Sequence, residues 1–263
     1  PFVAWPNPAL PGWAGSLDLV VVLAPDGNDP GTASAVAEAS RRGCQTVVAC
    51  PERSLVAEHV TGRWTTVLPT SSSDQLATAV AMLTFLDRVH LGPSADADAV
   101  ADALDEVAIA CSPHRDISIN PAKMLAISLA DASPLVWGGS VLAARAARRV
   151  AESIRRTSGR TALAGDAEHL LPVIEAARPR NVFEDPFDQA TSDLRPVLIV
   201  LDDGVADPVA DDQRKRLLEA ADRHDVRVEH VSSQAQGPVD CYSSLLLHGT
   251  YAAEYLRLGL VED

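Results

Sequence analysis

The residues best suited to binding a ligand lie in a short turn near the start of the chain. Residues 24–32 read APDGNDPGT, between an apolar run and a helical pattern. Gly27, Asn28 and Thr32 offer backbone amides, an amide side chain and a hydroxyl, a donor set that can cradle a phosphate where a helix begins. An ordinary capped turn has the same spacing, and the carboxylates of Asp26 and Asp29 disfavour an anion. The segment is therefore either a phosphate-binding turn or a plain connection.

Two later segments mix glycines and polar side chains in a similar way. Residues 137–140 read WGGS, where Gly138 and Gly139 allow the backbone to approach closely and Ser140 offers a hydroxyl that can also cap a helix. Residues 201–204 read LDDG, and the aspartate pair suits either a hydroxyl-rich ligand or a solvated turn. Since parallel α/β sheets bind ligands where strands end and helices begin, both segments are candidate binding loops.

Histidine and cysteine spacings indicate no metal or redox site. The seven histidines include no HxxxH pair and the four cysteines no CxxC pair, so we predict no metal and no cofactor. Cys44 and Cys50 flank an apolar run, which favours buried free thiols. His248 interrupts an apolar helical face; a hydrogen-bonded structural role is the simpler interpretation, and a role as proton donor is the alternative.

The elements that must position these segments alternate between strand and helix. Continuous apolar, β-branched runs predict strands at residues 17–24, 44–50, 64–70, 134–139, 160–165, 196–204 and 226–233. Helical spacing and caps predict helices at 32–42, 53–60, 72–91, 140–156, 167–177, 211–224 (begun by an aspartate) and 239–260. Such alternation with short connections predicts parallel sheets.

The stretch from 93 to 131 breaks this alternation, since it reads as helix with an acidic first half and contains no strand pattern. We therefore predict an α/β protein with two doubly wound parallel-sheet domains joined by a helical linker. The expected boundaries are 1–92 for the first domain, 93–131 for the linker and 132–263 for the second domain.

Composition excludes several classes of partner. With 22 Lys and Arg against 36 Asp and Glu, the net charge of -14 argues against nucleic acid and against anionic lipid surfaces. The sequence shows neither an apolar stretch of the roughly 18–20 residues that span a bilayer nor a signal peptide. We expect a cytoplasmic protein with no membrane partner.

Four stretches carry a resemblance to a known family. They read DLVVVLAPDGNDPGTASAVAEASRRGCQTVVAC, PLVWGGSVLAARAARRVAESI, PVLIVLDDGVADPVADDQRKRLLEAADRHDVRVEHVSSQAQG and YSSLLLHGTYAAEYLRLGLVED. They resemble the phosphate turn, the opening of the second domain, the later strands with their arginine-bearing helix (Arg214), and the final helix of the two-domain sugar isomerase (SIS) family. The likeness is greatest to bifunctional phosphoglucose/phosphomannose isomerases.

The resemblance implies two SIS-type domains, the first lacking its N-terminal part, a phosphorylated sugar bound between them, and a homodimer paired through helices, with the 245–260 helix as the expected contact. The substrate-binding residues that it implies are Gly27, Asn28, Thr32, Gly138, Gly139, Ser140 and Arg214.

The catalytic motifs of that family are altered here. Aldose–ketose isomerisation needs a carboxylate base that carries a proton between two carbons. Where the family has that glutamate, residues 157–162 read TSGRTA, and where it has a ring-opening histidine, residues 175–188 contain none. Glu184 is our candidate for a replacement base, with Asp185 and Asp188 as alternatives, and His248 is our candidate for the proton donor.

Three functions remain open on this sequence. The altered motifs favour a protein that binds a sugar phosphate with weak or lost isomerase activity. An active isomerase for glucose 6-phosphate and mannose 6-phosphate is the first alternative, and a structural subunit with no ligand is the second.

Overall fold

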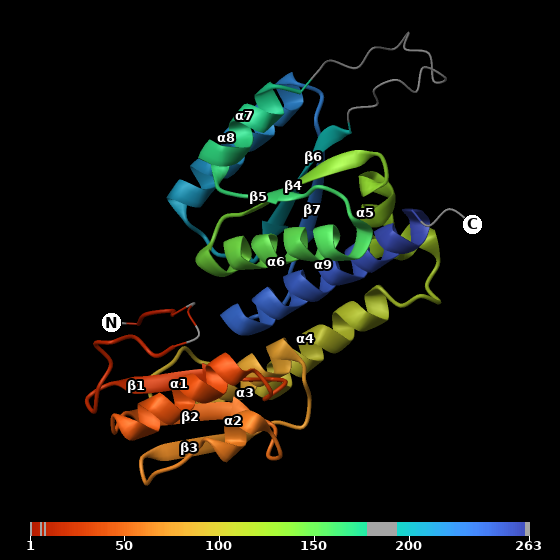
Figure 1. The fold of residues 1–263 in the computed structure, drawn as a ribbon. Helices are drawn as coiled ribbons and strands as arrows, with labels where there is room; N and C mark the ends of the chain where they lie inside the picture. The colour runs from red at the N-terminus through yellow and green to blue at the C-terminus, as the bar shows by residue number, and fades with distance from the viewer. Residues whose placement is uncertain (1, 6, 8, 178–193, 261–263) are drawn as a thin grey trace. The chain divides into compact units, whose positions relative to one another are not determined.

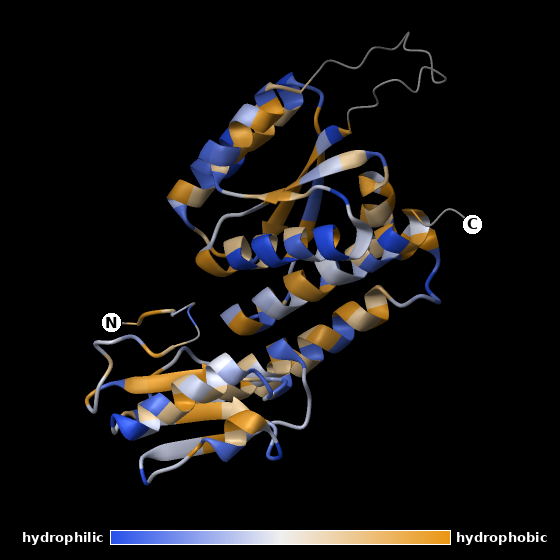
Figure 2. Cartoon of the chain, viewed as in Figure 1, coloured by the Kyte–Doolittle hydropathy of each residue, from blue (hydrophilic) through white to orange (hydrophobic). Residues whose placement is uncertain are grey.

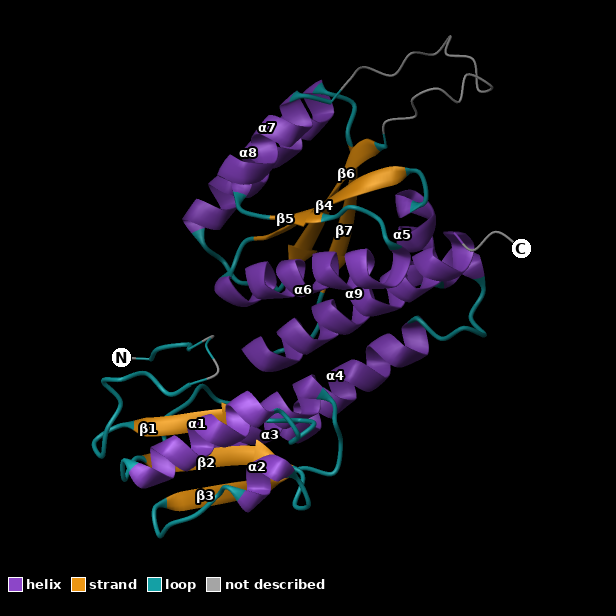
Figure 3. Cartoon of the chain, viewed as in Figure 1, coloured by secondary structure: helices purple, strands orange, loops and turns teal. Residues whose placement is uncertain are grey.

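The computed structural model describes residues 2–5, 7, 9–177 and 194–260. The chain forms two compact units, Pro1–Ala97 (unit 1) and Asp98–Asp263 (unit 2) (Figure 1). Each unit has its own parallel sheet with helices on both faces (Figure 3). The α/β class with parallel sheets is therefore confirmed.

Unit 1 is a small three-layer arrangement. Its described elements are β1 (Leu19–Leu23), α1 (Pro30–Arg41), β2 (Gln45–Cys50), α2 (Leu55–Glu58), β3 (Thr65–Pro69) and α3 (Gln75–Arg88). The strands are parallel in the order β1-β2-β3. The central strand is buried on both faces: Val48 packs towards α1 and α2, and Val47 packs against Met82 of α3. An apolar strand without alternation is what such two-sided burial requires.

Unit 2 is larger and holds the longer helices. Its elements are α4 (Ala97–Ala110), η1 (Ile117–Ile119), α5 (Pro121–Leu129), β4 (Ala132–Gly138), α6 (Val141–Ser158), β5 (Leu163–Ala164), α7 (Ala167–Glu175), β6 (Arg195–Asp202), α8 (Pro208–Arg223), β7 (Arg227–Ser232) and α9 (Pro238–Leu260). The described strands pair in parallel in the order β5-β4-β6-β7.

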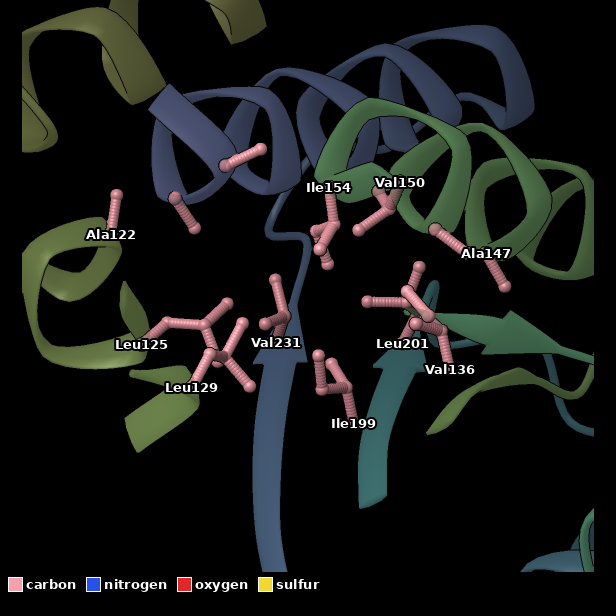
Figure 4. Close-up of a cluster of buried hydrophobic side chains, with 14 of the residues drawn as sticks. Ala122, Leu125, Leu129, Val136, Ala147, Val150, Ile154, Ile199, Leu201 and Val231 are labelled. Carbon is pink, nitrogen blue, oxygen red and sulfur yellow. The ribbon is translucent and has the colours of Figure 1, made fainter. Parts of the chain in front are cut away.

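Both faces of the unit 2 sheet are covered by helices. Val136, Ile199 and Val231 point towards α5, α6 and α9, where they meet side chains such as Leu125 and Val150 (Figure 4). The alternate positions of β4 and β6 pack against α7 and α8 in a second cluster. Hydrophilic residues recur along α6, in keeping with a helix that buries one side only (Figure 2).

Most predicted elements agree with the structure to within a few residues, although β5 and α2 are shorter than the strand expected at 160–165 and the helix expected at 53–60. Helix α8 begins at Pro208 instead of residue 211, because Asp207 caps it and proline suits the first turn of a helix. The stretch expected to be a linker is helical; from Asp98 onward it belongs to unit 2, where α5 packs against α9. Among the described residues, no helix is both long enough and apolar enough to cross a membrane.

Candidate functional site

The sheet of unit 2 has a point where the strand order changes direction. From β4 the chain passes outward to β5 on one side, whereas from β6 it passes to β7 on the other. Strands β4 and β6 are neighbours, with Gly138 in register with Leu201, so their carboxyl ends lie side by side. Ligands of doubly wound sheets bind at such switch points. The 138–140 turn and the 202–204 turn, both expected as binding loops, therefore meet here.

The two glycines after β4 are required by close packing. A Cβ atom on Gly138 would lie 2.3 Å from the carbonyl carbon and 2.4 Å from the carbonyl oxygen of Ala143 in α6. A Cβ atom on Gly139 would lie 2.8 Å from the Ala210 Cβ atom of α8 and 2.9 Å from the ring of Trp137. The glycines bring β4, α6 and α8 together, which accounts for them without a phosphate.

Ser140 links the start of α6 to the turn after β6. Its Oγ atom accepts a hydrogen bond from the Ala143 amide at 3.0 Å, which caps the helix. The same hydroxyl donates to the carboxylate of Asp203. The hydroxyl that we predicted to contact a ligand is thus already bonded to an acid on the neighbouring loop.

Arg214 reaches the switch point from α8. Its Nη1 atom donates to Asp202 Oδ2 at 3.2 Å, and its Nη2 atom lies 3.1 Å from Asp202 Oδ1. Partial burial alone would raise the pKa of Asp202, but the Gly204 amide and the Arg214 guanidinium outweigh it, so that pKa lies below its ordinary value. The pair is a charge-assisted, two-point contact at the end of β6.

Trp137 lies beneath this contact. Its side chain is fully buried, and the Arg214 Cζ atom stands 5.7 Å from the centre of its ring, which is within the range of a cation–π interaction. The Trp137 Nε1 and Arg214 Nε atoms are both buried, and neither has a hydrogen-bond partner among the described residues. A buried donor without a partner costs about 1–3 kcal/mol of folding free energy. The cation–π pair of Trp137 and Arg214 holds two such donors.

The neighbouring strand end adds another acid. After β7, the Gly237 amide donates to the buried carboxylate of Asp240 at 2.8 Å. Burial raises the pKa of the Cys241 thiol, as do the charges of Asp240 and Asp203. In the part of the chain that the structure describes, no three His, Cys, Asp or Glu side chains gather in a way that could hold a metal ion.

In the turn of unit 1 that was predicted to bind phosphate, the carboxylate of Asp29 takes up donors that a phosphate would need. Asp29 Oδ2 accepts from both the Thr32 amide and the Thr32 hydroxyl, each at 2.7 Å, and these bonds lower the pKa of Asp29. Gly27 has a φ of +65°, and a Cβ atom on it would lie 2.4 Å from the Ser54 Cβ atom, so the turn needs glycine here. Asn28 borders a shallow open pocket together with Arg53.

Comparison with known families identifies the fold. Residues 118–259, which lie in unit 2, match the model of the bacterial phospho-glucose isomerase C-terminal SIS domain. The chain belongs to this SIS-domain family. The predicted resemblance to SIS proteins of the phosphoglucose isomerase kind is therefore confirmed. No curated protein sequence matches the chain.

Solved structures with the same fold cover nearly the whole SIS chain. A glucose-6-phosphate isomerase like protein from Thermus thermophilus has a TM-score of 0.57 at 15% identity, covering 95% of this chain and 83% of that one. Tagatose-6-phosphate ketose/aldose isomerase from Escherichia coli has a TM-score of 0.66 at 12% identity, covering 95% and 72%. The C-terminal domain of glucosamine-fructose-6-phosphate aminotransferase from Francisella tularensis has 0.62 at 10%, covering 94% and 73%.

The structure describes only one of the two predicted catalytic residues of this SIS protein, His248. Glu184, like Asp185 and Asp188, lies outside the described residues. His248 lies in α9, where it is hydrogen bonded to the backbone of Pro121 at the start of α5. Since proline has no amide hydrogen, the imidazole donates to its carbonyl group. Burial lowers the pKa of His248 below its ordinary value.

Sequence reasoning missed Trp137 and Arg53 as polar groups beside the candidate turns. Trp137 was included in the predicted 137–140 loop, but its indole was given no role, since a buried indole has the same pattern as any core residue. Its position directly before two glycines at a strand end was the signal that could have found it. Arg53 follows Pro51 in a short loop, and nothing in its spacing points to Asn28.

Proposed function

We propose that this SIS protein binds a phosphorylated sugar and has weak or no isomerase activity. The observation that carries the proposal is the cluster at the switch point of unit 2, where Ser140, Asp202 and Asp203 at adjacent strand ends meet Arg214 of α8. This is where doubly wound sheets bind their ligands, and the cluster offers both acceptors and donors. Gly27, Asn28 and Thr32 of unit 1 remain predicted contacts for the phosphate, with Asp29 as an internal competitor.

The state of His248 supports the loss of turnover. A proton donor must reach the reacting oxygen and titrate near the working pH. The His248 imidazole is instead bonded to a backbone carbonyl between two packed helices, and its pKa lies below the ordinary value. Residues 157–162, at the end of α6 and beyond it, carry no carboxylate that could act as the base.

An active aldose–ketose isomerase is the second candidate, favoured by the family match and by the isomerase structures that share the fold. A coupled assay with fructose 6-phosphate and mannose 6-phosphate, run beside thermal unfolding with the same compounds, separates the two. A rise in melting temperature without turnover supports the binding protein. Turnover that is abolished in Glu184→Gln supports the enzyme. If no sugar phosphate raises the melting temperature, the structural subunit is favoured.

A cytoplasmic homodimer remains part of the proposal. The apolar residues of α9, where we expected the contact, largely serve the core of unit 2: Leu245, Ala252 and Leu256 are buried there. Exposed apolar side chains of unit 2 include Leu258 of α9, Ile119 of η1 and Met124 of α5. Light scattering of the purified chain tests the expected dimer, and a monomer at micromolar concentration would contradict it.

A further inference from the structure

Near the turns after β4 and β6, some hydrogen-bond donors have no partner and some acceptors could accept further bonds. Asp203 accepts from the Ser140 hydroxyl and, at 3.3 Å, from the Val205 amide, whereas a carboxylate has room for about four donors. Trp137 Nε1 and Arg214 Nε are donors with no partner in the described parts of the chain. A ligand that fits must therefore both donate and accept.

The charge at this edge disfavours a phosphate group. Three carboxylates, those of Asp202, Asp203 and Asp240, stand at the ends of β6 and β7, and the Arg214 guanidinium that offsets them is already paired with Asp202. A doubly charged phosphate would meet net repulsion here. A sugar hydroxyl carries no charge, donates one hydrogen bond and accepts two, so it matches both kinds of group.

We infer that the switch point of unit 2 binds the hydroxyl-bearing carbon chain of the sugar and not its phosphate, with Asp203 accepting from the hydroxyl groups and Arg214 and Trp137 donating to them. The inference rests on the proposed function and adds Trp137 to the contacts.

Arg214 controls access to the indole. The Trp137 side chain is fully buried, and the guanidinium that stands over its ring belongs to a side chain that is 29% exposed. Gly139 lies against the edge of the ring formed by Cη2 and Cζ2, since a Cβ atom on it would lie 2.9 Å from Cη2. An incoming hydroxyl therefore reaches the Trp137 N–H as the guanidinium shifts on the ring, which couples binding to a change in the surroundings of the indole.

Nuclear magnetic resonance of the indole N–H groups tests this directly. With ¹⁵N-labelled tryptophan the chain has four indole groups, at Trp5, Trp13, Trp64 and Trp137, and Trp137→Phe identifies the buried one. We expect fructose 6-phosphate to shift the Trp137 signal in a saturable way. Inorganic phosphate at the same concentration leaves it in place.

Matched variants connect the signal to binding. Trp137→Phe removes the N–H while keeping an aromatic ring, and we expect its affinity for fructose 6-phosphate to be about tenfold lower. We expect a similar loss of affinity in Asp203→Asn. Trp64 is the control, since Arg63 also stands over its ring, at 4.3 Å, but the side chain is exposed. Trp64→Phe leaves affinity unchanged.

The failures of the two proposals are distinguishable. If fructose 6-phosphate raises the melting temperature equally in the unmodified chain and in Trp137→Phe, with no shift of the Trp137 signal, the chain binds the sugar phosphate elsewhere and the inference is wrong. A Trp137 signal that moves with inorganic phosphate alone would also overturn it. If no sugar phosphate raises the melting temperature of the unmodified chain, the proposed function itself is wrong.

Discussion

Units 1 and 2 each place a carboxylate beside a turn that leads from a strand into a helix, but with different consequences. In unit 1 a single aspartate, Asp29, takes both donors of Thr32, and the described strands run in one direction without a switch point. In unit 2 the helix cap is Ser140, the carboxylate comes from the neighbouring strand end, and the two turns meet where the strand order changes. The comparison shows that a neighbouring strand end can supply a capped turn with polar groups that the turn itself lacks.

The largest effect is expected from filling the close contact at the switch point. Gly138→Val would drive its side chain into the backbone of Ala143, so we expect a loss of about 3 kcal/mol or more in the free energy of unfolding. Gly12→Val in unit 1 is the control, because a Cβ atom there meets nothing within 4 Å. Urea unfolding measures both. Equal stabilities would show that β4 and α6 do not approach as described.

Removing the guanidinium from the switch point should have a smaller but clear effect. Arg214→Met leaves the partly buried carboxylate of Asp202 without its charged partner, at a cost of about 1–3 kcal/mol at pH 7. Arg216→Met on the same helix is the control, since it breaks an ion pair with Glu168, which is 70% exposed, and exposed pairs contribute little.

The same pair predicts a pH dependence. Because the pKa of Asp202 is lowered in the folded chain, its contribution to stability is complete above the ordinary value of 3.8 and is lost as the pH falls through the lowered pKa. The difference in unfolding free energy between the unmodified chain and Arg214→Met should therefore shrink between pH 5 and pH 3. A difference that stays constant or grows would mean that Asp202 is not held by Arg214.

A moderate effect on binding is expected in unit 1. Asp29→Ser keeps a helix cap but removes the charge that competes with an anion, so we expect binding of inorganic phosphate to tighten several-fold. Asp74→Ser, at the start of α3, changes a similar cap away from the predicted phosphate turn. Calorimetric titration measures the affinity of both variants for inorganic phosphate. Equal affinities would show that the Asp29 carboxylate does not compete with phosphate for this turn.

The smallest effect is expected at His248. Its pKa is lowered in the folded chain, so the unfolded chain takes up the proton first and stability falls as the pH drops below the ordinary value of 6.5. His248→Gln can still donate to the Pro121 carbonyl, and we expect it to bind sugar phosphate normally and to lose part of this pH dependence. Loss of turnover in His248→Gln, measured in the coupled assay, would restore His248 as a catalytic residue.

The sequence predicted the fold well because long apolar runs leave few alternatives. The strand at 196–204 and the helix at 140–156 differ from β6 and α6 by two residues at most. The turns were located correctly, but the partners within them were not predicted. Ser140 meets Asp203 and Arg214 meets Asp202 only through the order of the strands, which spacing along the chain does not encode. Trp137 was placed in the predicted 137–140 loop, but a role for its N–H was not predicted, since burial places the indole among apolar neighbours.

Calorimetric titration of fructose 6-phosphate into the unmodified chain, Arg214→Met and Arg216→Met tests the central claim most directly. If the switch point of unit 2 contacts the sugar phosphate, the unmodified chain and Arg216→Met bind with equal affinity and Arg214→Met binds at least tenfold more weakly. Affinity that is the same in all three would contradict the claim, as would a lack of binding by the unmodified chain.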